Sequence, residues 1–196
     1  MTDVTTVQYY RSHAVEYAAA TAGVSMGHPL RSFGEMLDAG ASVLDIGCGG
    51  GRDLRELRLG GFNPVGLEQS PELAQIAARH SGCPVAVADM MDMPFADGSF
   101  DAVWSSASLV HFGTETVPRA LRQVRRVLRT DGVFFASVKR GDGAGTDASG
   151  RYFTYFQPAQ WIAIVEAAGF EMLAVLDEEP PTSGTPRWIR ILAKSP

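Results

Sequence analysis

The sequence VLDIGCGGG, residues 43–51, decides the fold. An apolar run containing one acidic residue leads into four glycines within five positions, and a helical pattern begins at Arg52. We interpret these residues as a buried strand, a tight turn and a helix N-terminus. Glycine has no Cβ, so a ligand can lie against the backbone, and a helix N-terminus offers unpaired N–H groups to an anion. The alternative is a turn without a ligand, but such a turn needs fewer glycines.

Composition places the chain among ordinary globular proteins. It has 196 residues, 45% hydrophobic and 20% charged, with a net charge of −5. We expect one domain, residues 1–196, and no nucleic-acid or membrane partner, because the chain is acidic and lacks an apolar run of about 18 residues. The N-terminus lacks a signal pattern and the two cysteines are not clustered, so we expect reduced thiols and a cytoplasmic location.

Outward from the glycine turn, strands alternate with helices. Apolar runs predict strands at residues 42–46, 64–67, 85–88, 100–105, 133–138, 171–176 and 188–192. Helical spacing predicts helices at residues 3–22, 30–37, 52–59, 71–80, 116–129 and 158–168. Residues 141–150 and 178–186 read as loops, the first of them mobile. The alternation predicts an α/β protein, with a mostly parallel sheet covered by helices on both faces.

Polar residues follow the expected strand ends, where such sheets bind ligands. They are Asp45, Gly47, Glu68, Asp89 and Ser105. A dinucleotide site requires G-x-G-x-x-G, but the position of the third glycine holds an arginine, which weakens the nicotinamide interpretation.

The pocket residues fit a different cofactor. Arg52 suits a ligand carboxylate, Glu68 can accept both hydroxyls of a ribose, and Asp89 can reach an adenine amino group. A carboxylate, a ribose and an adenine without a pyrophosphate describe S-adenosylmethionine better than NAD.

Four motifs resemble the class I S-adenosylmethionine-dependent methyltransferases, in particular small bacterial proteins with a type 11/25-like domain. They are VLDIGCGGGRD at 43–53, GLEQSPELAQIA at 66–77, ADMMDMPFADGSFDAVWSSASLVHF at 88–112 and LRQVRRVLRTDGVFFASV at 121–138. The resemblance covers roughly residues 40–140. It implies a Rossmann-like three-layer αβα sandwich whose seven strands lie in the order 3-2-1-4-5-7-6, the last antiparallel. It also implies cofactor contacts at Asp45, Gly47, Gly49, Glu68, Gln69, Asp89 and Met90.

Aromatic residues and one histidine mark the expected acceptor side. Residues 1–30 are interpreted as a helical lid, and aromatic faces attract a sulfonium, although each ring is as easily a core residue. His111 follows the fourth strand, and its usual pKa of about 6.5 suits a general base; alternatively it only shapes the pocket or caps the next helix. Further cofactor contacts are expected at Tyr10, Arg52 and Ser105. The candidate acceptor-binding residues are Tyr9, His13, Tyr17, His111, Arg151, Tyr152 and Phe153.

The sequence therefore predicts methyl transfer from S-adenosylmethionine to an O or N atom of a small molecule, by direct displacement, with S-adenosylhomocysteine as product. A non-catalytic S-adenosylmethionine-binding or regulatory protein and a nicotinamide oxidoreductase remain alternatives. The arginines of residues 116–129 are interpreted as a solvated face. We expect a monomer or a homodimer and no metal, because His13, His28 and His80 lack ligand spacing.

Overall fold

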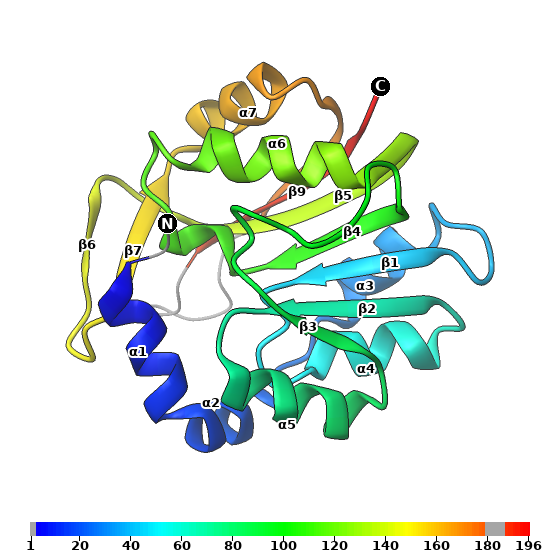
Figure 1. Ribbon diagram of the computed structural model, residues 1–196. Coiled ribbons are helices and arrows are strands. Elements are labelled where there is room, and N and C mark those ends of the chain that lie inside the picture. The colour runs from blue at the N-terminus through cyan, green and yellow to red at the C-terminus, as the bar shows by residue number, and fades with distance from the viewer. Residues whose placement is uncertain (1–2, 179–186) are drawn as a thin grey trace.

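The computed structural model describes residues 3–178 and 187–196. A central sheet carries helices on both faces (Figure 1). Five strands run parallel in the order β3 (Val85–Val87), β2 (Asn63–Glu68), β1 (Ser42–Ile46), β4 (Phe100–Ser106) and β5 (Leu128–Arg140). Next to β5 lies β9 (Trp188–Lys194), antiparallel to it, and β8 (Glu171–Glu178) pairs with β9 at the sheet edge. These seven strands confirm the predicted order and the antiparallel last strand.

Two further strands extend the sheet beyond the prediction. β6 (Ala144–Thr146) and β7 (Tyr152–Phe156) form an antiparallel hairpin, and β7 pairs with β5 only at Lys139 and Arg140. The prediction of a mobile loop at 141–150 is therefore wrong in part. Phe153, Thr154 and Phe156 are buried, so β7 is held by the core although the glycine-rich segment before it reads as loop. The predicted loop at 178–186 lies almost wholly outside the described residues.

The helices follow the expected order with shifted ends. They are α1 (Val4–Ser12), α2 (Ala14–Thr21), α3 (Gly27–Gly34), α4 (Arg52–Leu59), α5 (Pro71–Ser81), α6 (Val117–Val127) and α7 (Pro158–Ala167), with a 3-10 turn, η1 (Leu109–His111). The single helix predicted at 3–22 is broken at His13, where the backbone turns to φ −119° and ψ 28°. α3 begins earlier than predicted, because Pro29 is tolerated in a first helical turn. Ser70 caps α5 as expected, its hydroxyl accepting from the Leu73 N–H.

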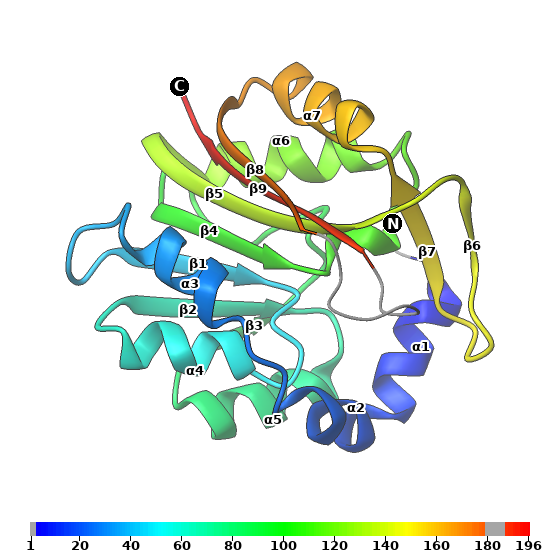
Figure 2. The same cartoon turned by 180° about the vertical axis from the view of Figure 1, so that it is seen from behind.

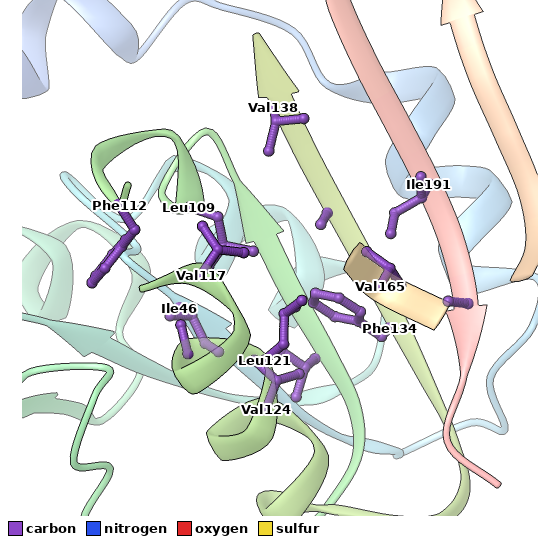
Figure 3. Packing of buried hydrophobic residues seen from close by; sticks show 14 of the residues in the cluster. Ile46, Leu109, Phe112, Val117, Leu121, Val124, Phe134, Val138, Val165 and Ile191 are labelled. Carbon is purple, nitrogen blue, oxygen red and sulfur yellow. The ribbon is translucent and has the colours of Figure 1, made fainter. Parts of the chain in front are cut away.

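The two faces of the sheet bury separate cores. On one face, α3 and α4 place Phe33 and Leu57 against Trp104 and Phe135 (Figure 2). On the other, the apolar stripe of α6 packs with residues of α7 and of the strands (Figure 3). The residues labelled there include Val117, Leu121, Val124, Phe134, Val165 and Ile191. None of the described helices is both long and apolar enough to cross a membrane.

Gly51 tests how tightly the glycine turn is packed. Its φ is +83°, and a Cβ there would lie 2.8 Å from the backbone of Ala77 in α5. We expect Gly51→Ala to lower the free energy of unfolding by about 2–4 kcal/mol, through backbone strain and overpacking. Urea unfolding measures this, and Gly23→Ala is the matched control, since nothing lies within 4 Å of its Cβ position. Equal midpoints for the two variants would contradict this packing.

Candidate active site

The carboxyl ends of the parallel strands point toward α1 and α2 (Figure 1). Residues of these strand ends and of both helices line a hollow. The hollow has two adjoining parts that share Tyr17, Gly47, Gly49 and Ser106. One part is also lined by Thr6, Val7, Tyr10, Leu67, Glu68, Gln69, Ser70, Leu73, Ala88, Met90, Ala107, Ser108, His111 and Phe112. The other is lined by Thr21, Asp45, Cys48, Gly50, Arg52 and Asp53. The hollow therefore runs across the glycine turn from α4 to η1.

Glu68 joins the glycine turn to the second strand–helix unit. Its Oε2 accepts from the Gly49 N–H at 3.0 Å, and its Oε1 accepts from the Ser70 N–H at 2.9 Å. Burial raises the pKa of Glu68, and its backbone hydrogen bonds partly oppose that rise. Each oxygen has lone pairs beyond its single N–H partner, so the carboxylate can still accept hydroxyl groups of a ligand in the hollow.

Asp45 provides an unpartnered acceptor. The residue is 2% exposed, and its Oδ2 has no hydrogen-bond partner among the described residues. Burial, together with the charge of Asp53, raises the pKa of Asp45 well above its usual range. A buried acceptor of this kind fits a positively charged ligand group, such as an amino-acid ammonium.

Arg52 is held beside Asp45 by a residue that the sequence reasoning missed. Its Nε and Nη2 donate to the two oxygens of Asp53 at 2.6 and 2.8 Å. The same carboxylate accepts from Trp104 Nε1 at 2.9 Å, so Asp53 is fixed by the core. Arg52 thus lines the hollow with its guanidinium oriented, as a ligand carboxylate requires. The signal for Asp53 was an acid in the first helical turn directly after Arg52.

At the opposite end, Gln69 and Met90 line the hollow, whereas Asp89 does not. Asp89 Oδ1 accepts from the Met91 N–H at 2.9 Å, and Gln69 Nε2 lies 3.5 Å from Oδ2. The adenine contact of Asp89 stays a prediction; its side chain lies next to Gln69, which lines the hollow.

The structure places Ser105 differently from the expectation. Ser105 is buried with its hydroxyl 2.7 Å from that of Ser108, and it is not a lining residue. The next residue, Ser106, lines both parts of the hollow, because successive strand residues point to opposite faces.

His111 is buried on the acceptor side, with both ring nitrogens engaged. Nδ1 lies 2.7 Å from the Tyr152 carbonyl oxygen, and Nε2 lies 2.9 Å from the Tyr10 hydroxyl. A carbonyl only accepts, so Nδ1 carries the proton and Nε2 accepts from Tyr10. Burial lowers the pKa of His111 to about 4, and the cations Arg151 and Lys139 act in the same direction. The ring is therefore neutral at neutral pH.

The aromatic candidates separate into two groups. Tyr10 and Tyr17 line the hollow, edge to face at 4.9 Å, and burial raises the pKa of both. Tyr9 is not a lining residue; it stacks on the exposed His13 at 4.5 Å. The structure thus brings Tyr10 and Tyr17 to His111 and leaves Tyr9 and His13 outside.

Residues of the β6–β7 hairpin support the wall from behind. Arg151 lies over the Tyr9 ring at 4.8 Å and is paired with Asp147, and the Phe153 ring lies 4.8 Å from that of His111. Neither Arg151, Tyr152 nor Phe153 lines the hollow. Thr6, which the sequence reasoning missed, does so: its Oγ1 accepts from the Tyr152 N–H at 2.8 Å. Within residues 3–178 and 187–196, no cluster of three or more His, Cys, Asp or Glu is placed to hold a metal.

Comparison with known proteins identifies the fold. Residues 44–136 match the family described as a methyltransferase domain. Two solved structures have the same fold. The first is a [4+2]-cyclase, SpnF, with a TM-score of 0.78 at 22% identity. The superposition covers 100% of this chain and 98% of the SpnF chain. The 1,6-didemethyltoxoflavin-N1-methyltransferase of Burkholderia thailandensis, solved with S-adenosylhomocysteine, has a TM-score of 0.75 at 22% identity, covering 96% and 88%.

Two curated relatives are similar in sequence to this chain over part of their length. An uncharacterized protein of Methanocaldococcus jannaschii, MJ1252, is 44% identical over 100 residues, which is 50% of this chain and 37% of that protein. The methyltransferase GfsG of Streptomyces halstedii is 32% identical over 173 residues, 77% of this chain and 61% of its own. The chain thus spans less than two thirds of the length of these curated relatives.

The strand order, the glycine turn and the acid that ends β2 define an α/β protein built to bind a nucleoside-containing cofactor. With the family match, they identify residues 44–136 as a methyltransferase domain of the class I S-adenosylmethionine-dependent kind, whose cofactor is S-adenosylmethionine. The hollow fits that molecule, because the unpartnered Asp45 oxygen lies at one end and the Glu68 carboxylate near the middle.

Removing the Glu68 carboxylate tests the ribose contact. We expect Glu68→Ala to weaken S-adenosylhomocysteine binding at least tenfold, because up to two charge-assisted hydrogen bonds of roughly 1.5–3 kcal/mol each are lost. Titration calorimetry measures this. Glu56→Ala is the control, since that side chain is 54% exposed on α4. An affinity within twofold of the parent in a folded Glu68→Ala protein would rule out the contact.

The buried neutral ring of His111 predicts a pH effect on stability. The pKa of His111 in the folded protein is about 4, below its usual value of about 6.5. The buried neutral ring therefore contributes its full share of the unfolding free energy above pH 6.5, and this share is lost as the pH falls toward 4. Over that range, wild type should lose roughly 3 kcal/mol of unfolding free energy that His111→Gln does not lose. Urea unfolding at several pH values measures the difference. The exposed His28→Gln should follow wild type, and parallel curves for wild type and His111→Gln would count against a buried neutral ring.

Proposed function

We propose that this protein transfers a methyl group from S-adenosylmethionine to an O or N atom of a small-molecule acceptor, releasing S-adenosylhomocysteine. One observation carries the proposal: a single hollow, bordered by α1 and α2, is lined both by the glycine turn with Glu68 and by His111. The residues proposed to bind the cofactor and a neutral histidine therefore line the same hollow. In this proposal residues 1–30 act as the lid.

The cofactor would be held along its whole length. Asp45 and Arg52 would take the ammonium and carboxylate of its methionine part, Glu68 the ribose hydroxyls, and Gln69 and Met90 the adenine, with Asp89 behind them. Gly47 and Gly49 let it approach the backbone, since both have positive φ, and the Gly49 Cβ position lies 3.3 Å from the Tyr17 ring. The faces of the Tyr10 and Tyr17 rings would suit a sulfonium.

S-adenosylmethionine supplies a methyl group that is already activated by its bond to a positively charged sulfur. The protein's main task is then to align the acceptor atom with that methyl group, a proximity effect that can lower the barrier by several kcal/mol. A base is needed only where the acceptor must lose a proton. Nε2 of His111 would serve as this base, because the proton of the neutral ring is on Nδ1 and Nε2 accepts from the Tyr10 hydroxyl.

We infer a small acceptor from the two segments, α1 and β7, that lie over the site. α1 lies beside β7, and the hydrogen bond from the Tyr152 N–H to Thr6 Oγ1 joins them at 2.8 Å. In this proposal the contact covers the acceptor side, and a macromolecular acceptor would have to displace it. We therefore propose a molecule that fits inside the closed hollow.

Two assays test the proposal together. Titration calorimetry with S-adenosylmethionine and with NAD should give binding to the first alone. A panel of phenols, carboxylic acids, primary amines and thiols is then assayed for S-adenosylhomocysteine release. Binding without release in every case would favour the non-catalytic alternative, and binding of NAD would favour an oxidoreductase.

His111→Ala should reduce turnover of a proton-bearing acceptor by about 10²–10⁴-fold if the ring is a base. Cofactor affinity should stay within twofold of wild type, and the loss should depend on pH. His28→Ala, an exposed histidine on α3, is the control. A small loss that is independent of pH would show that His111 only shapes the pocket.

A further inference from the structure

Hydrogen bonds close a ring through three segments around His111. The Tyr152 N–H donates to Thr6 Oγ1 at 2.8 Å, and His111 Nδ1–H donates to the Tyr152 carbonyl at 2.7 Å. The Tyr10 hydroxyl lies 2.9 Å from Nε2, and Tyr10 and Thr6 share one face of α1, since they are four residues apart. α1, η1 and β7 are therefore linked in a cycle that contains the candidate base.

The direction of each bond in this cycle is fixed. The Tyr152 carbonyl can only accept, so the proton of the neutral imidazole is on Nδ1. Nε2 can then only accept, which orients the Tyr10 hydroxyl hydrogen toward it. Tyr10 lines the hollow, and its hydroxyl also interacts with Arg151 and Tyr17. While α1 is in place, the lone pair of Nε2 is occupied, so an acceptor in the hollow meets the Tyr10 oxygen first.

We propose that Tyr10 is a second catalytic residue, whose hydroxyl relays the acceptor's proton to Nε2 of His111. This inference rests on the proposed function. The acceptor's X–H bond breaks as its proton joins the Tyr10 oxygen, and the original Tyr10 proton moves to Nε2, giving an imidazolium. The acceptor atom forms its bond to the methyl carbon as the carbon–sulfur bond breaks, and the sulfonium becomes a neutral thioether. His111 later returns its proton to solvent.

The charged surroundings of the pair favour a relay over a free tyrosinate. Burial raises the pKa of Tyr10, so the phenol exchanges protons without standing ionised. The groups whose charges reach the His111 ring are Arg151 and Asp147 of the β6–β7 hairpin, which pair with each other, and Lys139 of β5, which lies over the Phe153 ring at 3.4 Å. Burial, assisted by Arg151 and Lys139 and opposed by Asp147, lowers the pKa of His111, so Tyr10 is the proton donor next to a neutral ring.

The relay makes the base depend on closure of α1. If α1 swings away, His111 keeps its tautomer through Tyr152 but loses its link to the acceptor. Closure of α1 and removal of the acceptor's proton then occur together. With α1 open, His111 has no Tyr10 hydroxyl through which to take that proton.

Nuclear magnetic resonance of the histidine ring nitrogens tests the pair without any acceptor. In the full chain, with and without S-adenosylhomocysteine, His111 should show the Nδ1–H tautomer. Tyr10→Phe removes a donor to the neutral ring and should raise the pKa of His111 from about 4 by roughly 0.5–1. Tyr155→Phe is the matched control, because Tyr155 is half-buried on β7 and does not line the hollow. An Nε2–H tautomer, or a His111 pKa unmoved in Tyr10→Phe, would overturn the proposal.

Kinetics test the relay itself. With a phenol from the acceptor panel, Tyr10→Phe should lower kcat by about 10–10²-fold, with cofactor affinity within threefold and Tyr155→Phe unchanged. The double variant Tyr10→Phe/His111→Ala should be no slower than His111→Ala alone, since residues on one proton path are not additive. A Tyr10→Phe kcat within twofold of wild type, or additive losses, would reject the relay. No S-adenosylhomocysteine from wild type with any acceptor would instead reject the proposed function, and the resonance titration would still decide whether the pair exists.

Discussion

The site depends on one buried carboxylate that ties two strand–helix units together. Glu68 accepts from Gly49 in the turn after β1 and from Ser70 at the start of α5. An ionised carboxylate is costly to bury unless hydrogen bonds stabilise its charge, so the backbone N–H groups of both units must converge on it. The Gly47 N–H also donates to the Leu67 carbonyl at 2.7 Å. This hydrogen bond holds the end of β1 against the end of β2. The binding surface is therefore preformed by packing of neighbouring strands.

Charge is distributed unevenly along the hollow, in a way that fits methyl transfer from a cation. Asp45, Asp53 and Glu68 lie near the cation Arg52 at the glycine turn, and this excess of acids favours a positively charged ligand there. The cations Lys139 and Arg151 lie near His111 at the other end. His111 would gain a positive charge in the step in which the sulfur loses one. The net charge of the enclosed space then stays constant, and the low-polarity surroundings of His111 oppose the transfer less than they would oppose a new charge.

Local patterns were sufficient for the parts of the fold that local interactions determine. The β1 turn, the Ser70 cap and the α6 stripe were predicted because their signals lie within a few residues. The strand order came from the family resemblance. What failed depends on distant contacts: Trp104 fixes Asp53 across 51 positions, and Thr6 meets Tyr152 across 146. The alternation of side chains along a strand does not reveal which of Ser105 and Ser106 faces the hollow unless the register of β4 is known. The β6–β7 hairpin was not predicted because its glycines are typical of a loop.

In the proposed mechanism the N-terminal helices would act as a lid, and few apolar contacts anchor them. In α1 and α2 only Thr6 and Ala14 are buried, while Val4 and Val15 are 71% and 70% exposed. Segments with few buried apolar groups open at low free-energy cost, as a lid over an enclosed site must for the cofactor and acceptor to enter. Polar contacts then determine the closed position, and these are the bonds of Thr6 and Tyr10 with Tyr152 and His111. If α1 is the proposed lid, the same bonds that hold it closed also orient the proposed base, so closure would produce the geometry that the reaction requires, and the weak apolar packing of α1 would favour catalysis.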